Sequence, residues 1–96
     1  MKKIELNKIA EVLEEQGRSM EWLSRKMQVH RVTVSNWCRN IYQPNLYQLA
    51  LIADLLGVEM LSLLHNPTPA QLAQIRELHF RSKETDGRGK EKQKTK

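Results

Sequence analysis

The chain has 96 residues, enough for one compact domain with an appended segment but not for two separate hydrophobic cores. Apolar residues make up 40% of the chain and aromatic residues 5%, and because Leu, Ile, Met and Ala dominate, we expect an all-α fold. One cysteine rules out an internal disulfide, and neither a long apolar run nor a cleavable signal pattern is present, so we expect a cytoplasmic protein outside any membrane.

The net charge of +5 is distributed unevenly. Residues 1–80 carry nine Lys/Arg and eight Asp/Glu, whereas residues 81–96 carry seven and three. A second basic stretch, residues 18–45, has one acidic residue, Glu21, and five basic ones, Arg18, Arg25, Lys26, Arg31 and Arg39. Clustered cations are typical of a surface that binds a polyanion, because each neutralised phosphate releases counterions. A solvated helix face explains the same charges equally well, so the spacing of other residues has to decide.

Two short helices are predicted near the start of the chain. Apolar side chains recur at helical spacing over residues 4–16, and Gly17 ends this helix. Ser19 is a suitable N-cap for a second helix over residues 20–27. Residues 28–29 then form a short link to the next helix.

A third helix begins at His30 or Arg31. Val34 and Trp37 give it an apolar side, which makes Trp37 a core residue rather than a platform for base stacking. Asn40 is suited to end this helix, because Asn tolerates the left-handed conformation.

The fourth helix comes after a loop over residues 40–45. Pro44 forbids a continuous helix through this loop, and Asn45 can cap the helix after it. Apolar residues at three- and four-residue spacing predict a helix over residues 46–56, which Gly57 ends.

The last predicted elements are shorter or less apolar. Residues 59–64 are expected to form a fifth helix that brings Leu61 and Leu64 to the core. A sixth helix can start at Pro69, with a partial stripe of Leu72, Ile75 and Leu78. From Ser82 onward no apolar residue remains, so disorder is expected. The predicted organisation is a compact five-helix domain over 1–66, an extra helix over 67–81 and a disordered basic tail over 82–96.

Two short helices joined by a tight turn, the second rich in small polar and basic residues, constitute a helix-turn-helix. In this motif the second helix enters the DNA major groove. Arg pairs with guanine, Asn with adenine, Ser with either base, and Val contacts a thymine methyl. The predicted base-contacting residues are therefore those on the outer side of the third helix, Arg31, Val32, Ser35 and Asn36.

The sequence resembles the Xre or Cro/CI-type family of lambda-repressor-like DNA-binding domains over about residues 5–64. The resemblance rests on three stretches: Ser19-x-Glu21-x-Leu23, then Val29-x-Arg31-x-Thr33-Val34-Ser35-x-Trp37, then Pro44-x-Leu46-x-x-Leu49-x-x-Ile52-Ala53-x-x-Leu56-Gly57-Val58. It implies a five-helix domain that acts as a transcriptional regulator, as a homodimer on a palindromic operator in double-stranded DNA.

The resemblance also implies contacts to the sugar-phosphate backbone. The positions that match the family's phosphate-contacting residues are Ser19, Met20, His30, Thr33, Arg39, Tyr42 and Asn45. Two positions depart from the family pattern. Met20 stands where the family usually has a Gln that touches phosphate, and Gln28 stands where a Gly usually adopts a positive φ.

Metal, cofactor and catalytic sites are not expected. His30, His65 and His79 lack metal-ligand spacing, and the chain has no Gly-rich phosphate loop and no nucleophile paired with a base. Two functions stay open. The first is a repressor that reads a major-groove operator with residues 30–39, and the second is an antitoxin-type module that binds its own operator and holds a protein partner through residues 67–82.

Overall fold

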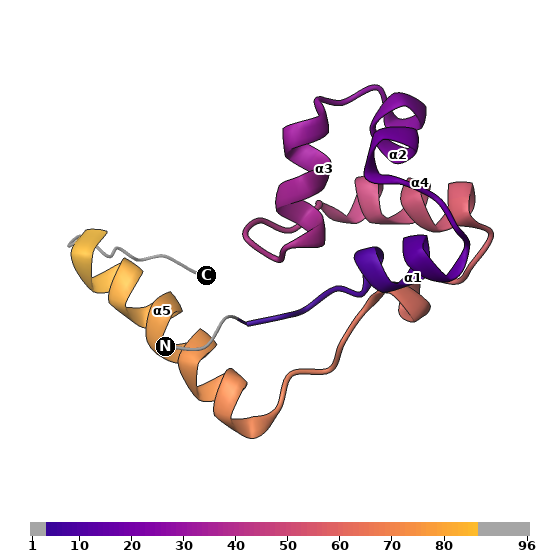
Figure 1. Cartoon of the computed structure of the whole chain (residues 1–96). Coiled ribbons are helices and arrows are strands. Elements are labelled where there is room, and N and C mark those ends of the chain that lie inside the picture. The colour runs from indigo at the N-terminus through magenta and orange to yellow at the C-terminus, as the bar shows by residue number, and fades with distance from the viewer. Residues whose placement is uncertain (1–3, 87–96) are drawn as a thin grey trace. The chain divides into compact units, whose positions relative to one another are not determined.

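A computed structural model describes residues 4–86, and the chain divides into two units between Asn66 and Pro67. In chain order the elements are α1 (Ile9–Glu15), α2 (Met20–Met27), α3 (Arg31–Cys38), α4 (Leu46–Leu56), the 3-10 helix η1 (Met60–Leu63) and α5 (Pro69–Asp86) (Figure 1). No strand occurs in residues 4–86, so the all-α prediction is confirmed. None of the helices there is both long and apolar enough to cross a membrane.

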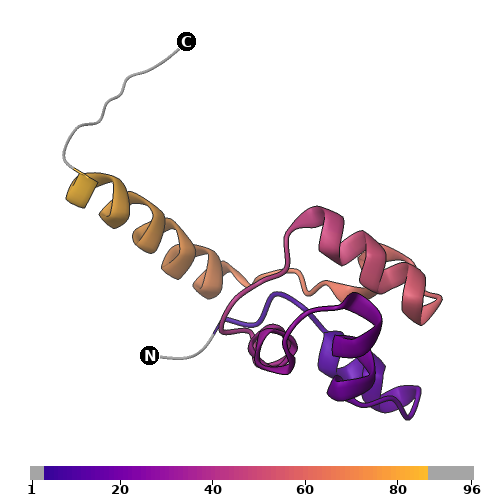
Figure 2. The same cartoon turned by 90° about the horizontal axis from the view of Figure 1, so that it is seen from above.

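The core of the first unit takes one completely buried residue from each of its five helical elements. These residues are Ile9 in α1, Leu23 in α2, Val34 in α3, Ile52 in α4 and Leu63 in η1. Figure 2 views α3 nearly along its axis and shows α1, α2 and α4 gathered on one side of it. The other side of α3 is free of helices from its own unit.

The first helix is shorter than its apolar pattern predicts, because residues 4–8 are not helical and α1 begins at Ile9. The Asn7 side chain accepts a hydrogen bond from the Ile9 backbone N–H at 3.0 Å, which marks the start of the helix. The Lys8 N–H donates to the Leu63 carbonyl at 2.7 Å. The predicted start at residue 4 is therefore wrong, since tertiary hydrogen bonds hold this segment outside a helix.

The predicted fifth helix over 59–64 is a short 3-10 helix with a different inner residue. Leu63 is completely buried, whereas Leu61 is 77% exposed and Leu64 is 37% exposed. A 3-10 helix has about three residues per turn, so Leu63 lies on the same side as Met60, which packs against the core, and Leu61 lies on another side. Leu64 follows the helix with an extended backbone. The prediction that these two leucines enter the core is wrong.

The predicted helix caps are confirmed. The Ser19 Oγ accepts the Trp22 N–H at 2.9 Å and begins α2. At the start of α4, Asn45 and Gln48 each accept the other's backbone N–H, at 2.8 and 2.9 Å. Gly57 ends α4 at a φ of 69°, in the left-handed region that favours glycine.

The second unit contains α5. Thr68 and Gln71 cap its start, since each side chain accepts the other's backbone N–H, at 3.1 and 2.9 Å. The helix continues through Asp86, past the predicted onset of disorder at Ser82. Charged residues such as Lys and Glu have good helix propensity, which is compatible with helix where no apolar residue remains. The rest of the predicted disordered tail, residues 87–96, lies outside the described residues.

Candidate nucleic-acid interface

The turn between α2 and α3 depends on one left-handed residue. Gln28 has a φ of 59°, and the next residue, Val29, donates its N–H to the Ser24 carbonyl at 3.1 Å. Ser24 is buried, and its hydroxyl donates to the Glu21 carbonyl at 2.8 Å. This turn of residues 28–30 reverses the chain tightly enough for α2 and α3 to pack against each other.

The start of α3 is capped by a histidine ring. The Nδ1 atom of His30 accepts the Val32 N–H at 3.2 Å. A neutral ring that accepts at Nδ1 carries its proton on Nε2, and His30 is exposed. Its Nε2–H is therefore a donor available to a group outside the chain.

The two sides of α3 differ sharply. Val34 and Trp37 are buried in the core, as the sequence predicts. On the outer side Val32 is 57% exposed, Arg31 and Arg39 are exposed, and Ser35 and Asn36 are half-buried. Helical spacing of three, four and seven residues puts four of these side chains on one face: Val32, Ser35, Asn36 and Arg39.

Arg31, at the start of α3, and Arg39, its C-cap, have no anionic partner among the described residues. Arg25 in α2 lies 3.8 Å from Glu21, whereas neither Arg31 nor Arg39 forms an ion pair within residues 4–86. Both guanidinium groups are exposed and keep all their N–H donors for a ligand.

The polar residues of the outer face are similarly unengaged. Within the described part of the chain, the side chains of Ser35 and Asn36 make no hydrogen bond, although both are half-buried. A partly buried amide or hydroxyl without a partner is stabilised by binding a group that pairs with it. Base edges in the major groove offer such groups.

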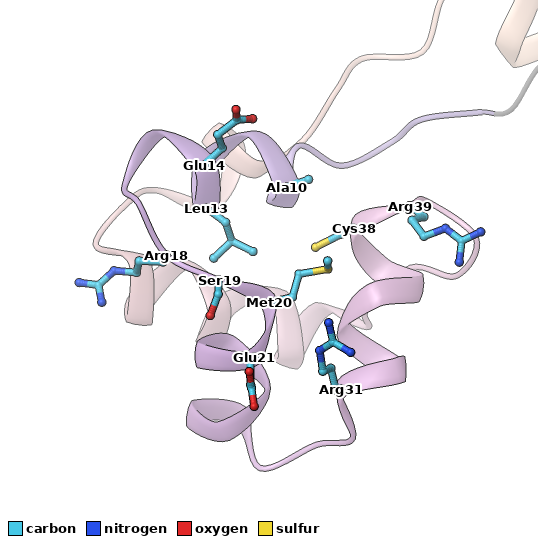
Figure 3. A pocket seen from close by; sticks show the side chains of 10 residues that line it. All are labelled: Ala10, Leu13, Glu14, Arg18, Ser19, Met20, Glu21, Arg31, Cys38 and Arg39. Carbon is cyan, nitrogen blue, oxygen red and sulfur yellow. The ribbon is translucent and has the colours of Figure 1, made fainter.

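A hollow of about 530 Å³ opens beside Arg31, between α1, the start of α2 and α3 (Figure 3). Met20 and Cys38 point into it, and Ser19 and Arg39 also line it. Burial raises the pKa of the Cys38 thiol from 9.0 to about 11, so the thiol is neutral. Met20 packs partly against the core, and a thioether donates no hydrogen bond, so only its backbone N–H can reach a phosphate.

The remaining predicted phosphate-contacting residues lie in or beside the helices: Ser19 and Asn45 cap α2 and α4, Thr33 is in the first turn of α3, and Tyr42 is in the loop between α3 and α4. Ser19, Tyr42 and Asn45 are exposed, whereas Thr33 is half-buried. The oxygens of Ser19 and Asn45 serve as helix caps, yet the hydroxyl hydrogen of Ser19 and the amide hydrogens of Asn45 stay available as donors.

Trp22 and Arg18 form a separate contact in the same unit. The Arg18 guanidinium lies 4.1 Å above the centre of the Trp22 ring, and its Nε–H donates to the Gln16 side chain at 3.3 Å. Trp22 is half-buried against the core. Arg18 is therefore engaged within the chain, unlike Arg31 and Arg39.

Comparison with known proteins agrees with this arrangement. A family model described as helix-turn-helix matches residues 9–63, more than half of the chain. The chain belongs to the Xre or Cro/CI-type helix-turn-helix family. It is similar to the crystal structure of a protein from Bacteroides fragilis to which DNA binding is ascribed: the TM-score is 0.62, the identity is 40%, and the match covers 62% of this chain and 97% of that one. No curated protein matches.

The Xre-type domain also contains two positioning residues that the motif does not point to. Asn7 is buried, and its side-chain amide donates to the Trp37 carbonyl at 2.9 Å and to the Gln43 side chain at 2.7 Å. Asn40 comes after α3 at a φ of 58° and receives the backbone N–H groups of Leu6 and Asn7. These contacts fix the C-terminal end of α3. The sequence predicts Asn40 only as a helix end. Asn7 falls inside the helix that the apolar pattern over residues 4–16 predicts, so no signal in the sequence points to it.

Proposed function

We propose that this protein is a sequence-specific double-stranded DNA-binding transcriptional regulator, most simply a repressor that occludes a promoter. In this proposal α3 lies in the major groove and reads bases through Arg31, Val32, Ser35 and Asn36. Helix α3 and its ends contact the sugar-phosphate backbone of the DNA through His30, Thr33 and Arg39. The neighbouring elements contact the DNA backbone through Ser19, Tyr42, Asn45 and the backbone N–H of Met20.

The observation that carries the proposal is the contrast between the two sides of α3. One side is fixed in the core by Val34 and Trp37, which holds the helix rigidly. The other side presents donors without partners in the described chain, together with one exposed valine. A rigid helix whose outer side offers Arg, Ser, Asn and Val carries the side chains that distinguish bases in the major groove.

A selection experiment tests sequence-specific binding. The full chain is incubated with a library of random duplexes, and bound fragments are amplified and sequenced over several rounds. We expect a motif with two inverted half-sites about 10 base pairs apart, because a two-fold dimer places two recognition helices one DNA turn apart. Bound fragments without any enriched motif would contradict base-specific recognition. A single enriched half-site would support base-specific recognition but contradict the dimer.

The antitoxin-type alternative is favoured by one feature, the exposed apolar residues of α5. Leu72, Leu78 and Phe80 are 43, 48 and 55% exposed. A helix with such residues is suited to hold a protein partner through residues 67–82. Coexpression with the protein encoded next to it distinguishes the two functions. A stable complex that disappears on deletion of residues 67–96 supports the antitoxin, and its absence supports the regulator alone.

A further inference from the structure

Helix α4 carries apolar residues on both its inner and its outer side. Nine of its eleven residues are Leu, Ile, Ala or Tyr, and Gln48 and Asp54 are the exceptions. A helix of this composition is typical of one covered on two sides. The core of the first unit covers one side, through Leu49, Ile52, Ala53 and Leu56.

The opposite side of α4 is exposed. Tyr47 is 90% exposed, Leu46 is 74% exposed and Leu51 is 48% exposed, and Ala50 and Asp54 are exposed beside them. Spacings of three, four and seven residues place Tyr47, Ala50, Leu51 and Asp54 on one stripe. We call the five residues Leu46, Tyr47, Ala50, Leu51 and Asp54 the α4 face.

Charge disfavours DNA as the molecule that covers the α4 face. Residues 40–75 contain no Lys or Arg, and Asp54 is the only charged residue of the face. The α4 face thus offers phosphates no positive charge and one negative charge, so no counterion release favours a polyanion on it. A mostly apolar surface with one tyrosine and a single carboxylate is instead suited to a protein–protein interface.

The order of residues along the face makes it complementary to itself. When two α4 helices lie antiparallel and centred between residues 50 and 51, Tyr47 faces residue 54 of the other helix and Ala50 faces residue 51. A tyrosine hydroxyl then meets a carboxylate, which accepts its hydrogen bond, and a small side chain meets a large one. An isologous two-fold contact requires this kind of reciprocal match.

We propose that the α4 face is the dimer interface of this protein, with its occupant the α4 face of a second copy in antiparallel orientation. The Tyr47 hydroxyl donates to the partner's Asp54, and Ala50 receives the partner's Leu51. This inference rests on the proposed function, because it names the partner of a regulator that reads a palindromic operator. A single pair of helices buries less surface than the roughly 1,200 Å² of a stable interface, so the dimer is weak without DNA.

Sedimentation equilibrium of the full chain over a wide concentration range tests the interface without DNA. The variant Tyr47→Glu places a carboxylate next to the partner's Asp54, and we expect its dimerisation to be weaker by roughly 30-fold or more. The double variant Tyr47→Glu with Asp54→Lys replaces the hydrogen bond by an ion pair across the interface and should recover most of the loss. Within one chain residues 47 and 54 are about 10 Å apart along the helix, so recovery indicates an intermolecular contact.

Two matched variants serve as controls. Leu61→Glu alters a leucine of η1 that lies outside the face and is about as exposed as Leu46, at 77% against 74%. It should leave dimerisation unchanged. Leu78→Glu asks whether α5 is the occupant, and a loss of dimerisation in this variant would overturn the proposal. A monomeric wild-type chain at every concentration, or an unchanged dimer in Tyr47→Glu, would also overturn it. Binding to a duplex with a single half-site separates failure of the interface from failure of the proposed function. If Tyr47→Glu binds the half-site normally, DNA recognition is intact whatever its dimerisation. If the wild-type chain binds no duplex, the proposed function itself fails.

Discussion

Asn7 and Asn40 bind each other across 33 residues of sequence, by two hydrogen bonds between one side chain and one backbone. The Asn40 Oδ1 accepts the Asn7 N–H at 3.0 Å, and the Asn40 Nδ2 donates to the Asn7 carbonyl at 3.3 Å. Asn40 comes directly after the C-cap of α3, and Asn7 lies just before α1. The pair therefore ties the end of the proposed recognition helix to the N-terminal segment.

Replacing Asn7 by alanine should destabilise the first unit by about 2–4 kcal/mol. The substitution removes three side-chain hydrogen bonds and leaves buried groups such as the Trp37 carbonyl without partners. The free energy of unfolding, measured in urea, checks this value. Asn36→Ala is the matched control, because the Asn36 side chain makes no hydrogen bond within the described residues, and it should change stability by less than about 0.5 kcal/mol. Equal losses in both variants would contradict the assigned role of Asn7.

Gln28 occupies a left-handed position that favours glycine, and its replacements should differ in sign. Gln28→Gly removes the strain at a φ of 59° but adds backbone entropy to the unfolded chain, so stability should rise by at most about 1 kcal/mol. Gln28→Val should destabilise by more than about 1 kcal/mol, because a β-branched residue resists this conformation. Thermal unfolding of the three proteins side by side provides the comparison. A valine variant as stable as the glycine variant would show that the turn does not require a positive φ.

Cys38 should react slowly with alkylating reagents in the folded protein. Because burial raises its pKa to about 11, the thiolate fraction at pH 8 falls about 100-fold below that of a thiol with a pKa of 9.0. Mass spectrometry after timed exposure to iodoacetamide measures the rate, which should rise with pH up to about 11. The same chain unfolded in urea provides the reference rate. Similar rates in the folded and unfolded chain would contradict the partly buried, neutral thiol.

Capping residues explain why much of the helix-turn-helix is predictable from sequence. Ser19 and Asn45 mark the starts of α2 and α4, and Gly57 marks an end, because each supplies a local hydrogen bond or a left-handed backbone. Local rules of this kind do not depend on the rest of the fold. The inner side of α3 is predictable for a similar reason, since Val34 and Trp37 share one face of the helix.

Long-range contacts account for the features that the sequence does not indicate. The apolar pattern over residues 4–8 resembles a helix, yet the Lys8 N–H pairs with the Leu63 carbonyl, a partner that no local rule identifies. The directions of the η1 leucines are not predictable, because the helix type, and with it the direction of each side chain, depends on packing against α4. Two candidate site residues illustrate the difference. The position of Arg39 on the same face as Val32 is predictable, because it results from helical spacing. The half-buried state of Met20 is not predictable, because it depends on packing against the core.

Removing residues 87–96 should change the salt dependence of DNA binding more than its sequence preference. This segment carries five Lys/Arg and one Glu, a net charge of +4. For each phosphate that the shortened chain no longer neutralises, the negative slope of log affinity against log salt becomes shallower by about 0.9. Titrations between low and moderate salt, with specific and random duplexes, measure the slope and the ratio of affinities. An unchanged slope would show that the segment does not contact DNA.

The most direct test of base reading by α3 compares Arg31→Ala with Arg25→Ala on selected and random duplexes. Arg31 has no ion-pair partner within the described residues, whereas Arg25 lies near Glu21 and outside the predicted contact set. We expect Arg31→Ala to weaken binding to the selected duplex by about 1–3 kcal/mol and to relax base preference at one position of each half-site. Arg25→Ala should leave the base preference unchanged. Equal losses for Arg31→Ala on selected and random duplexes would contradict base reading, because they would make Arg31 a phosphate contact.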